Sequence, residues 1–152
     1  KNKNCYIKTV NINEDKNFIK YDDYEKLDLN KKLPTDIEKY DYILLLDVIE
    51  HLSNPEKFLH KLSKTLNDKQ TVIVSTGNIA FIFVRIMLFF GFFNYGKRGI
   101  LDITHTRLFN FMTFRKIFLS YNFQIKKIIG IPVPIPFIFG NNLTLLQSLQ
   151  FG

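Results

Sequence analysis

The clearest pattern in the chain is an apolar run that ends in an acid. Residues 41–46 (Asp-Tyr-Ile-Leu-Leu-Leu) predict a strand buried on both faces, as in a parallel sheet. Asn54 and Pro55 then mark a helix start, and apolar residues recur at helical spacing as far as Leu66. A further strand is expected over 71–75, before a Gly-Asn turn. Strand, helix and strand with short links predict a βαβ unit with a right-handed crossover.

The rest of the chain carries signals for shorter elements. β-branched and aromatic residues favour strands, and apolar residues on one face favour a helix. Asn110 is placed to cap that helix, and Asn122 to adopt the left-handed conformation that ends it. The expected elements are strands over 5–12, 24–27 and 123–129, a helix over 112–121, single helical turns within 14–20 and 36–39, and a helical tail from Leu143.

Residues 79–95 form the most apolar segment of the chain. A membrane-spanning helix needs roughly 20 apolar residues with no charge near its centre. Arg85 and Gly91 interrupt this segment, so we expect a helix packed against the domain or lying on a lipid surface. The loop that follows, 96–102, contains the cations Lys97 and Arg98.

Length and charge indicate one domain with a sizeable core. The chain has 152 residues and a formal net charge of +7, which favours phosphate-bearing or membrane-surface partners. The lysines are scattered, and no basic and aromatic stripe indicates a nucleic-acid partner. The single cysteine, Cys5, excludes a disulfide framework within the chain, and its apolar neighbours predict that it is buried. A reducing, cytoplasmic setting fits this composition best.

Four motifs, taken in order, resemble those of a known family. They are DVIEHLSNP after the buried strand, TVIVSTGN after the next helix, and then GILDITHTRLF and NFQIKKIIG. This order is similar to that of class I S-adenosylmethionine-dependent methyltransferases. The resemblance covers most of residues 5–131. It is strongest to the group that includes quinone-biosynthesis O-methyltransferases and sugar- or polysaccharide-linked methyltransferases.

The resemblance implies an α/β fold with a mostly parallel, Rossmann-like sheet. Relatives have a glycine-rich loop after the first strand, whereas no glycine precedes Gly77 here. We therefore expect residues 1–152 to form a single truncated methyltransferase domain that lacks the first strand, its loop and the last antiparallel strand. Residues 79–109 correspond to the variable segment that builds the acceptor pocket in relatives.

Four residues match positions that hold S-adenosylmethionine in the family. Asn11 stands where an acid usually binds both ribose hydroxyls, and its amide can make only part of these contacts. Asp28 matches the acid that contacts the adenine amino group, and Leu29 would flank the ring. Asp47 matches the end of the fourth strand, near the methionine and sulfonium region. The alternatives are that Asp28 is a solvated turn residue and that Asp47 caps the following turn.

Glu50 and His51 follow Asp47 at a spacing that holds a divalent ion in quinone-type relatives. The same pair occurs in relatives without metal, and we assign no metal to it. Histidine exchanges a proton near neutral pH, so His51 is a candidate base for an acceptor hydroxyl, with Glu50 on the substrate side. Alternatively, both residues fix the entry to the helix by hydrogen bonds.

A second polar cluster, Thr-His-Thr-Arg at 104–107, follows the apolar segment. His105 is a second candidate catalytic base on the substrate side. Arg107 is a candidate to pair with a carboxylate or phosphate of the acceptor. The alternative is that both side chains tie this loop back onto the sheet.

The resemblance implies an enzyme that transfers a methyl group from S-adenosylmethionine to a small-molecule or lipid-linked sugar acceptor. Because the glycine-rich loop is missing, we expect this chain to bind the cofactor weakly or not at all, and to be inactive or weakly active. The alternative is a non-catalytic interaction or membrane-surface protein on a decayed methyltransferase scaffold. Asn11, the absent glycine-rich loop, the net charge and the apolar segment 79–95 favour this alternative, in which 79–95 would make peripheral contact with a membrane.

Overall fold

The computed structural model describes residues 5–13 and 21–131. The helical turn expected within 14–20 and the helical tail expected from Leu143 lie outside these ranges. The described elements are β1 (Lys8–Asn11), β2 (Asp23–Lys26), the 3-10 turn η1 (Ile37–Lys39), β3 (Tyr42–Leu46), the 3-10 turn η2 (Ile49–His51), α1 (Pro55–Thr65), β4 (Thr71–Ser75), α2 (Ile82–Phe89) and α3 (Phe111–Ser120).

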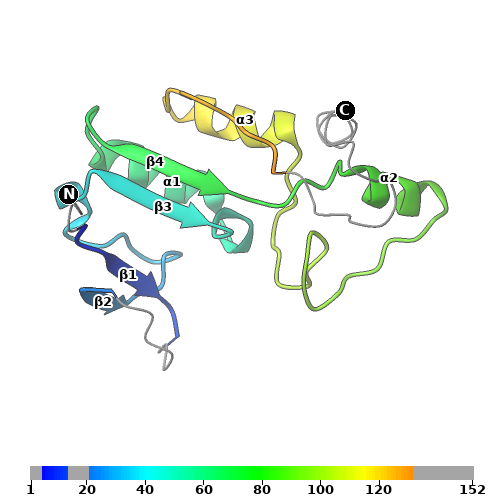
Figure 1. Cartoon of the computed structure of the whole chain (residues 1–152), viewed down its shortest axis with the longest axis horizontal. Helices are drawn as coiled ribbons and strands as arrows, with labels where there is room; N and C mark the ends of the chain where they lie inside the picture. The colour runs from blue at the N-terminus through cyan, green and yellow to red at the C-terminus, as the bar shows by residue number, and fades with distance from the viewer. Residues whose placement is uncertain (1–4, 14–20, 132–152) are drawn as a thin grey trace.

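Within the described residues, the strands form two parallel pairs. β1 pairs with β2, beginning at Lys8 opposite Asp23, and β3 pairs with β4, beginning at Tyr42 opposite Thr71. The arrowheads of β1, β3 and β4 point the same way in Figure 1, so their carboxyl ends lie toward one side of the molecule. The α/β fold class and the βαβ unit are therefore confirmed, and the short parallel sheets are consistent with a partial Rossmann-like methyltransferase fold.

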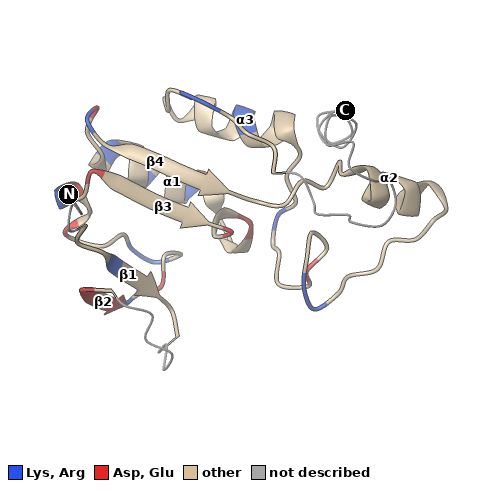
Figure 2. Ribbon diagram, in the orientation of Figure 1, with Lys and Arg blue, Asp and Glu red and all other residues tan. Residues whose placement is uncertain are grey.

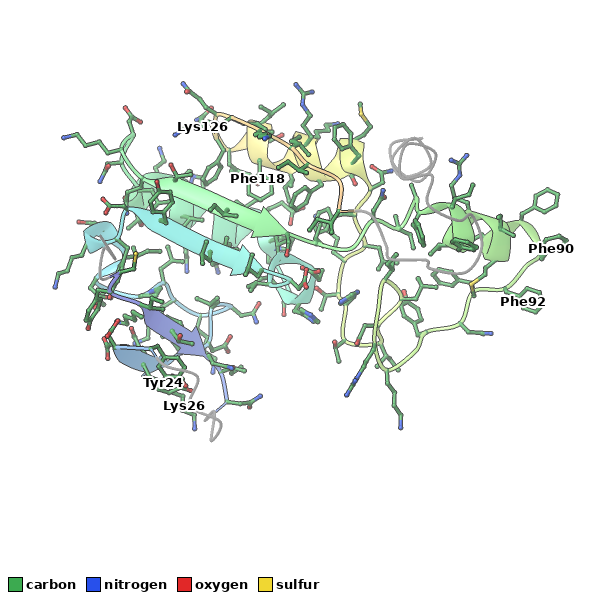
Figure 3. The ribbon with its side chains drawn as sticks, in the orientation of Figure 1. Tyr24, Lys26, Phe90, Phe92, Phe118 and Lys126 are labelled. Carbon is green, nitrogen blue, oxygen red and sulfur yellow. The ribbon has the colours of Figure 1, made fainter. Side chains whose placement is uncertain are left out.

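The hydrophobic core lies between the β3–β4 pair and the helices α1 and α3 (Figure 1). Leu45 of β3 and Leu59 and Leu62 of α1 are buried in it. Phe118, which is labelled on α3 in Figure 3, is also buried, and its ring contacts that of Phe123. The periodic apolar positions of α1 thus become its buried face, as their spacing predicts.

Asparagine side chains define both expected helix starts. Asn54 accepts a hydrogen bond from the backbone N–H of Lys57 at 2.7 Å, which caps α1. Asn110 accepts one from the backbone N–H of Thr113 at 2.8 Å, which caps α3. After α3, Asn122 has a φ of 62°, in the left-handed region that commonly ends a helix. These three predictions are confirmed.

The second face of the β3–β4 pair is exposed. Tyr42, Leu44 and Leu46 alternate along β3 and share this face, and all three side chains are exposed, as is Ile73 of β4. The expectation that residues 41–46 are buried on both faces is therefore wrong for the described chain. The physical reason is that α1 and α3 pack against Leu45 and its neighbours on the opposite face.

Two further sequence-based expectations are wrong. Cys5 is exposed rather than buried. Residues 123–129 form no strand, although Phe123 and Ile125 pack against the core. Lys126, labelled in Figure 3, reaches Thr71 of β4 through its side chain, with 3.3 Å between Nζ and Oγ1. Side-chain contacts therefore hold this segment beside β4 without the backbone pairing that defines a strand.

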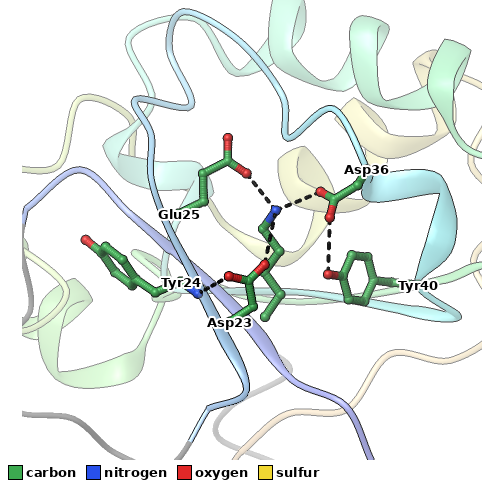
Figure 4. A network of polar contacts seen from close by, with 6 residues as sticks. Asp23, Tyr24, Glu25, Asp36 and Tyr40 are labelled. Carbon is green, nitrogen blue, oxygen red and sulfur yellow. Dashed lines mark hydrogen bonds and ion pairs between the residues drawn. The ribbon is translucent and has the colours of Figure 1, made fainter.

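An ion cluster around Lys8 joins the β1–β2 pair to the segment before β3. The Lys8 ammonium lies 2.8 Å from carboxylate oxygens of both Glu25 and Asp36, and 3.8 Å from Asp23 (Figure 4). The hydrogen bonds to Asp36 and Glu25 raise the pKa of Lys8, and the bond from Lys8 lowers the pKa of Asp36. This cluster holds β1, β2 and the chain that leads into β3 together.

The burial of α1 leads to a stability prediction. Leu59 is fully buried, so Leu59→Ala removes apolar contacts and leaves a cavity. We expect a loss of about 2–5 kcal/mol in the free energy of unfolding, measured by urea denaturation followed by circular dichroism. Lys57→Ala, at an exposed position of the same helix, is the control and should change stability little. Equal losses for the two variants would show that α1 does not anchor the core.

Candidate active site

The first part of the site is a set of hydrogen bonds that joins the ends of β3 and β4. Asp47 has a φ of 50°, a left-handed conformation that aspartate tolerates better than most residues. Its backbone N–H donates to the carbonyl of Ser75 at 3.2 Å and to the Ser75 hydroxyl at 3.1 Å. In return, the Ser75 hydroxyl donates to Asp47 Oδ1 at 2.8 Å. The carboxylate is thus held at the strand ends with further lone pairs to accept from a ligand.

The loop at 104–107 is attached to η2 through backbone groups. The Glu50 carbonyl accepts from the N–H groups of Thr106 at 2.9 Å and Arg107 at 3.2 Å. The Thr106 hydroxyl lies 3.0 Å from the same carbonyl and 2.6 Å from that of Leu52. This anchoring brings together two motifs that are more than 50 residues apart, since the contacts span sequence separations of 54 and 56.

The anchoring places the two candidate bases side by side. The rings of His51 and His105 lie with their centroids 4.7 Å apart and their planes at 67°. His105 Nδ1 is 3.0 Å from the Ile100 carbonyl. A carbonyl can only accept, so this nitrogen carries the proton, and Nε2 of the neutral ring is the basic atom.

His51 is held in the same tautomer by Thr104. The Thr104 hydroxyl donates its proton to Asp102 Oδ1 at 2.7 Å. Toward His51 Nδ1 it can therefore only accept, as can the Thr104 carbonyl, at distances of 3.2 Å and 3.3 Å. Nδ1 of His51 must carry the proton, which leaves Nε2 as the basic atom. Both imidazoles thus present the same nitrogen for proton transfer.

Asp102 supports this arrangement as an ionised carboxylate. Hydrogen bonds from the hydroxyl and the backbone N–H of Thr104 lower the pKa of Asp102. The N–H bond to Asp102 Oδ1 is 2.8 Å long. An ionised Asp102 keeps the Thr104 hydroxyl turned toward itself, and this in turn fixes the tautomer of His51.

Of the two residues predicted on the substrate side, Glu50 has a buried side chain and Arg107 has a structural contact. The Glu50 side chain is only 2% exposed, and its Oε2 has no hydrogen-bond partner among the described residues. Arg107 forms an ion pair with Glu56 of α1. Burial alone would raise the pKa of Glu56, but the bond from Arg107 and a backbone bond lower it overall. Substrate contact by Glu50 and Arg107 stays a prediction.

The predicted cofactor residues of the N-terminal part lie at the ends of β1 and β2. Asn11 is the last residue of β1, and its side-chain oxygen accepts from the Asn13 N–H at 3.1 Å. Asp28 follows β2, and its Oδ1 accepts from the Asn30 N–H at 2.9 Å. Leu29 packs against the hydrophobic core. The turn around Asp28 agrees with its alternative as a turn residue, although one carboxylate can accept more than one hydrogen bond.

One hydrogen bond joins the two parts of the site. The Asn30 side-chain oxygen accepts from the backbone N–H of Ser53 at 2.8 Å. Asn30 lies two residues after Asp28, and Ser53 lies two residues after His51. The loop after β2 is therefore attached to the loop after β3, and Asp28 and Asp47 lie toward the same edge of the strands.

Three residues of the site were given no role from the sequence: Ser75, Asp102 and Thr104. Ser75 could have been found as the polar residue at the end of the strand that follows the crossover. Asp102 and Thr104 form a local Asp-x-Thr turn, which is a common turn pattern with no chemical signature of its own. Among the residues that the structure describes, no group of three His, Cys, Asp or Glu side chains is placed to hold a metal ion.

Comparison with known proteins identifies the family of this chain. A family model described as "Methyltransferase domain" matches residues 4–128, which is most of the chain. The chain therefore belongs to this methyltransferase family. No curated protein matches it.

The Asp102–Thr104 contact leads to a prediction about pH dependence. Thr104→Val removes the hydroxyl bond, so the pKa of Asp102 should rise toward its ordinary value of 3.8. A depressed pKa contributes stability above pH 3.8 that is lost as the pH falls through the lowered value. The stability difference between wild type and variant should therefore shrink as the pH falls below 3.8.

Carboxyl ¹³C NMR titration and urea denaturation at a series of pH values measure the two effects. Thr65→Val is the matched control, because its hydroxyl donates to a carbonyl within α1. An unchanged pKa of Asp102 in Thr104→Val would contradict the role assigned to the hydroxyl.

Proposed function

We propose that the chain is an S-adenosylmethionine-dependent methyltransferase domain acting on a small-molecule or sugar-type acceptor, and that the chain of this length binds the cofactor weakly. Membership of the methyltransferase family supports methyl transfer. The observation that carries the proposal further is the bond between Asn30 and Ser53. It holds the loops bearing Asp28 and Asp47 at one edge, beside the histidine pair.

The residues at this edge fit S-adenosylmethionine in part. Asp28 and Asp47 supply carboxylate oxygens for the hydroxyl, amino and ammonium groups of such a molecule, and Asn11 supplies one amide oxygen. Ligands of open α/β folds bind outside the carboxyl ends of the strands, where these side chains stand. No glycine precedes Gly77 in the sequence, so the strand ends before it supply no glycine-rich backbone cradle to a ligand.

The histidine pair supplies the base that the proposed reaction needs. When bound, the cofactor supplies an electrophilic methyl group. Nε2 of His51 or of His105 would accept the proton of the acceptor hydroxyl, because Nδ1 of each ring already carries a proton. Asp102 and Thr104 keep His51 in this tautomer. Proximity contributes most of the rate in such a reaction, so correct orientation of the acceptor matters more than the strength of the base.

Weak cofactor binding follows from the exposed side chains next to this edge. Leu44 and Leu46, toward the carboxyl end of β3, present an apolar face to solvent. A binding site with one side open leaves more of a ligand hydrated, and fewer of its polar groups are paired.

We therefore expect isothermal titration calorimetry of the full 152-residue chain with S-adenosylmethionine to show binding weaker than micromolar. Asp28→Asn keeps the shape of the side chain but removes its charge, so affinity should fall several-fold because a charged acceptor bonds more strongly than an amide. Asp68→Asn, at an exposed position after α1, is the matched control and should leave affinity unchanged.

Micromolar binding by the wild type would contradict the claim of an incomplete site. Equal affinities for Asp28→Asn and Asp68→Asn would contradict the placement of the cofactor at this edge. No heat of binding from the wild type, even with S-adenosylmethionine at millimolar concentration, would contradict the proposed function itself.

A further inference from the structure

Residues 76–110, between β4 and α3, extend away from the rest of the protein and return beside the end of β4. We call this segment the excursion. Its two ends meet in a parallel bridge between Asn78 and Phe109, with a bond of 2.8 Å from the Ile79 N–H to the Phe109 carbonyl. In Figure 1, α2 lies at the far end of this excursion, away from α1 and the sheet. We propose that this excursion docks the protein on an anionic lipid bilayer.

Aromatic side chains are concentrated at the tip of the excursion. Phe89, Phe90 and Phe92 are 84%, 66% and 58% exposed, and Figure 3 shows Phe90 and Phe92 pointing outward beyond α2. Gly91 has a φ of 79°, and the Phe92 N–H bonds back to the Met87 carbonyl at 2.9 Å. This left-handed glycine reverses the chain, so that aromatic residues on both sides of it share the tip. Soluble proteins seldom expose so many large apolar side chains together without a partner.

The charges along this excursion favour a negatively charged partner. No Asp or Glu occurs between Asp68 and Asp102, whereas Arg85, Lys97 and Arg98 lie in this stretch. Lys97 and Arg98 occupy a tight turn that is closed by a bond of 2.8 Å from the Gly96 N–H to the Leu101 carbonyl. In Figure 2 this turn is coloured blue for its Lys and Arg residues, and it lies on the same excursion as α2. Exposed apolar residues and cations within one segment are typical of segments that lie in the interface of anionic bilayers.

A bilayer surface fits these observations better than a second copy of the chain. A second copy would bring the same acid-free segment and the same cations, so its charges would repel. α2 has eight residues and is about 12 Å long, much shorter than the hydrocarbon core of a bilayer. In the described part of the chain, no helix is long and apolar enough to cross a membrane. The excursion would therefore lie within one leaflet, with its aromatic side chains below the headgroups.

Vesicle flotation with the full chain tests this proposal. The protein should float with vesicles of equal parts phosphatidylcholine and phosphatidylglycerol, and much less with phosphatidylcholine alone. Phe89→Ser combined with Phe90→Ser should weaken binding at least about tenfold, since two buried phenyl groups are lost. Lys97→Ala combined with Arg98→Ala should weaken binding to the anionic vesicles about tenfold or more.

Matched controls distinguish binding through this surface from non-specific binding to vesicles through any exposed apolar or cationic side chain. Met112→Ser combined with Ile131→Ser removes two exposed apolar side chains elsewhere, and Lys57→Ala combined with Lys64→Ala removes two exposed cations of α1. Both control variants should bind like wild type. Thermal unfolding of every variant shows whether the fold is intact, and sedimentation without lipid shows whether the tip forms dimers.

A fluorescence measurement gives an independent readout, because the chain contains no tryptophan. The emission of Phe90→Trp should shift to the blue on addition of the anionic vesicles, and that of Met112→Trp should not. Failure of wild type to float, equal losses in the control variants, or dimers that depend on Phe89 and Phe90 would overturn the proposal. The vesicles contain no cofactor, so these outcomes are independent of the outcome for methyl transfer.

Discussion

The parallel pairing of β3 with β4 across α1 is the constraint on which the rest of the structure depends. Leu45 of β3 and the buried leucines of α1 share one core, to which α3 adds Phe118. Because the pairing is parallel, both strands end at the same edge, and this is why Asp47 can meet Ser75. An antiparallel pair would separate these residues by the length of a strand.

Hydrogen bonds to backbone groups attach the loops of His105 and Asp28 to this same edge. The Glu50 carbonyl holds the loop of His105, and the Ser53 N–H holds the loop of Asp28 through Asn30. The loops that carry His105 and Asp28 are thus attached to main-chain groups of the turn after β3. Substitutions of the side chains can therefore change chemistry without moving the loops. The excursion of α2 begins and ends beside this edge, so docking on a bilayer would bring the candidate site close to lipid-linked molecules.

Much of this fold could be predicted from the sequence, because local signals and tertiary packing agree. The caps Asn54 and Asn110 and the apolar spacing of α1 each specify an element on their own. The sequence motifs also indicated both histidines. What local patterns could not predict was tertiary: which face of β3 is covered, and that residues 123–129 reach β4 through the side chain of Lys126 instead of a backbone ladder. The partnership of Asp102 with Thr104 and His51 depends on a fold-level contact, so no spacing in the sequence could reveal it.

We propose that Asp28 and Asp47 border one cofactor site at the carboxyl ends of the strands. Amide chemical-shift mapping by NMR, with S-adenosylmethionine added at millimolar concentration to the full chain, tests it most directly. We expect shifts concentrated at Asn11, Asp28, Asp47 and their neighbours. Shifts confined to the opposite ends of the strands, around Lys8, Tyr42 and Thr71, would contradict it.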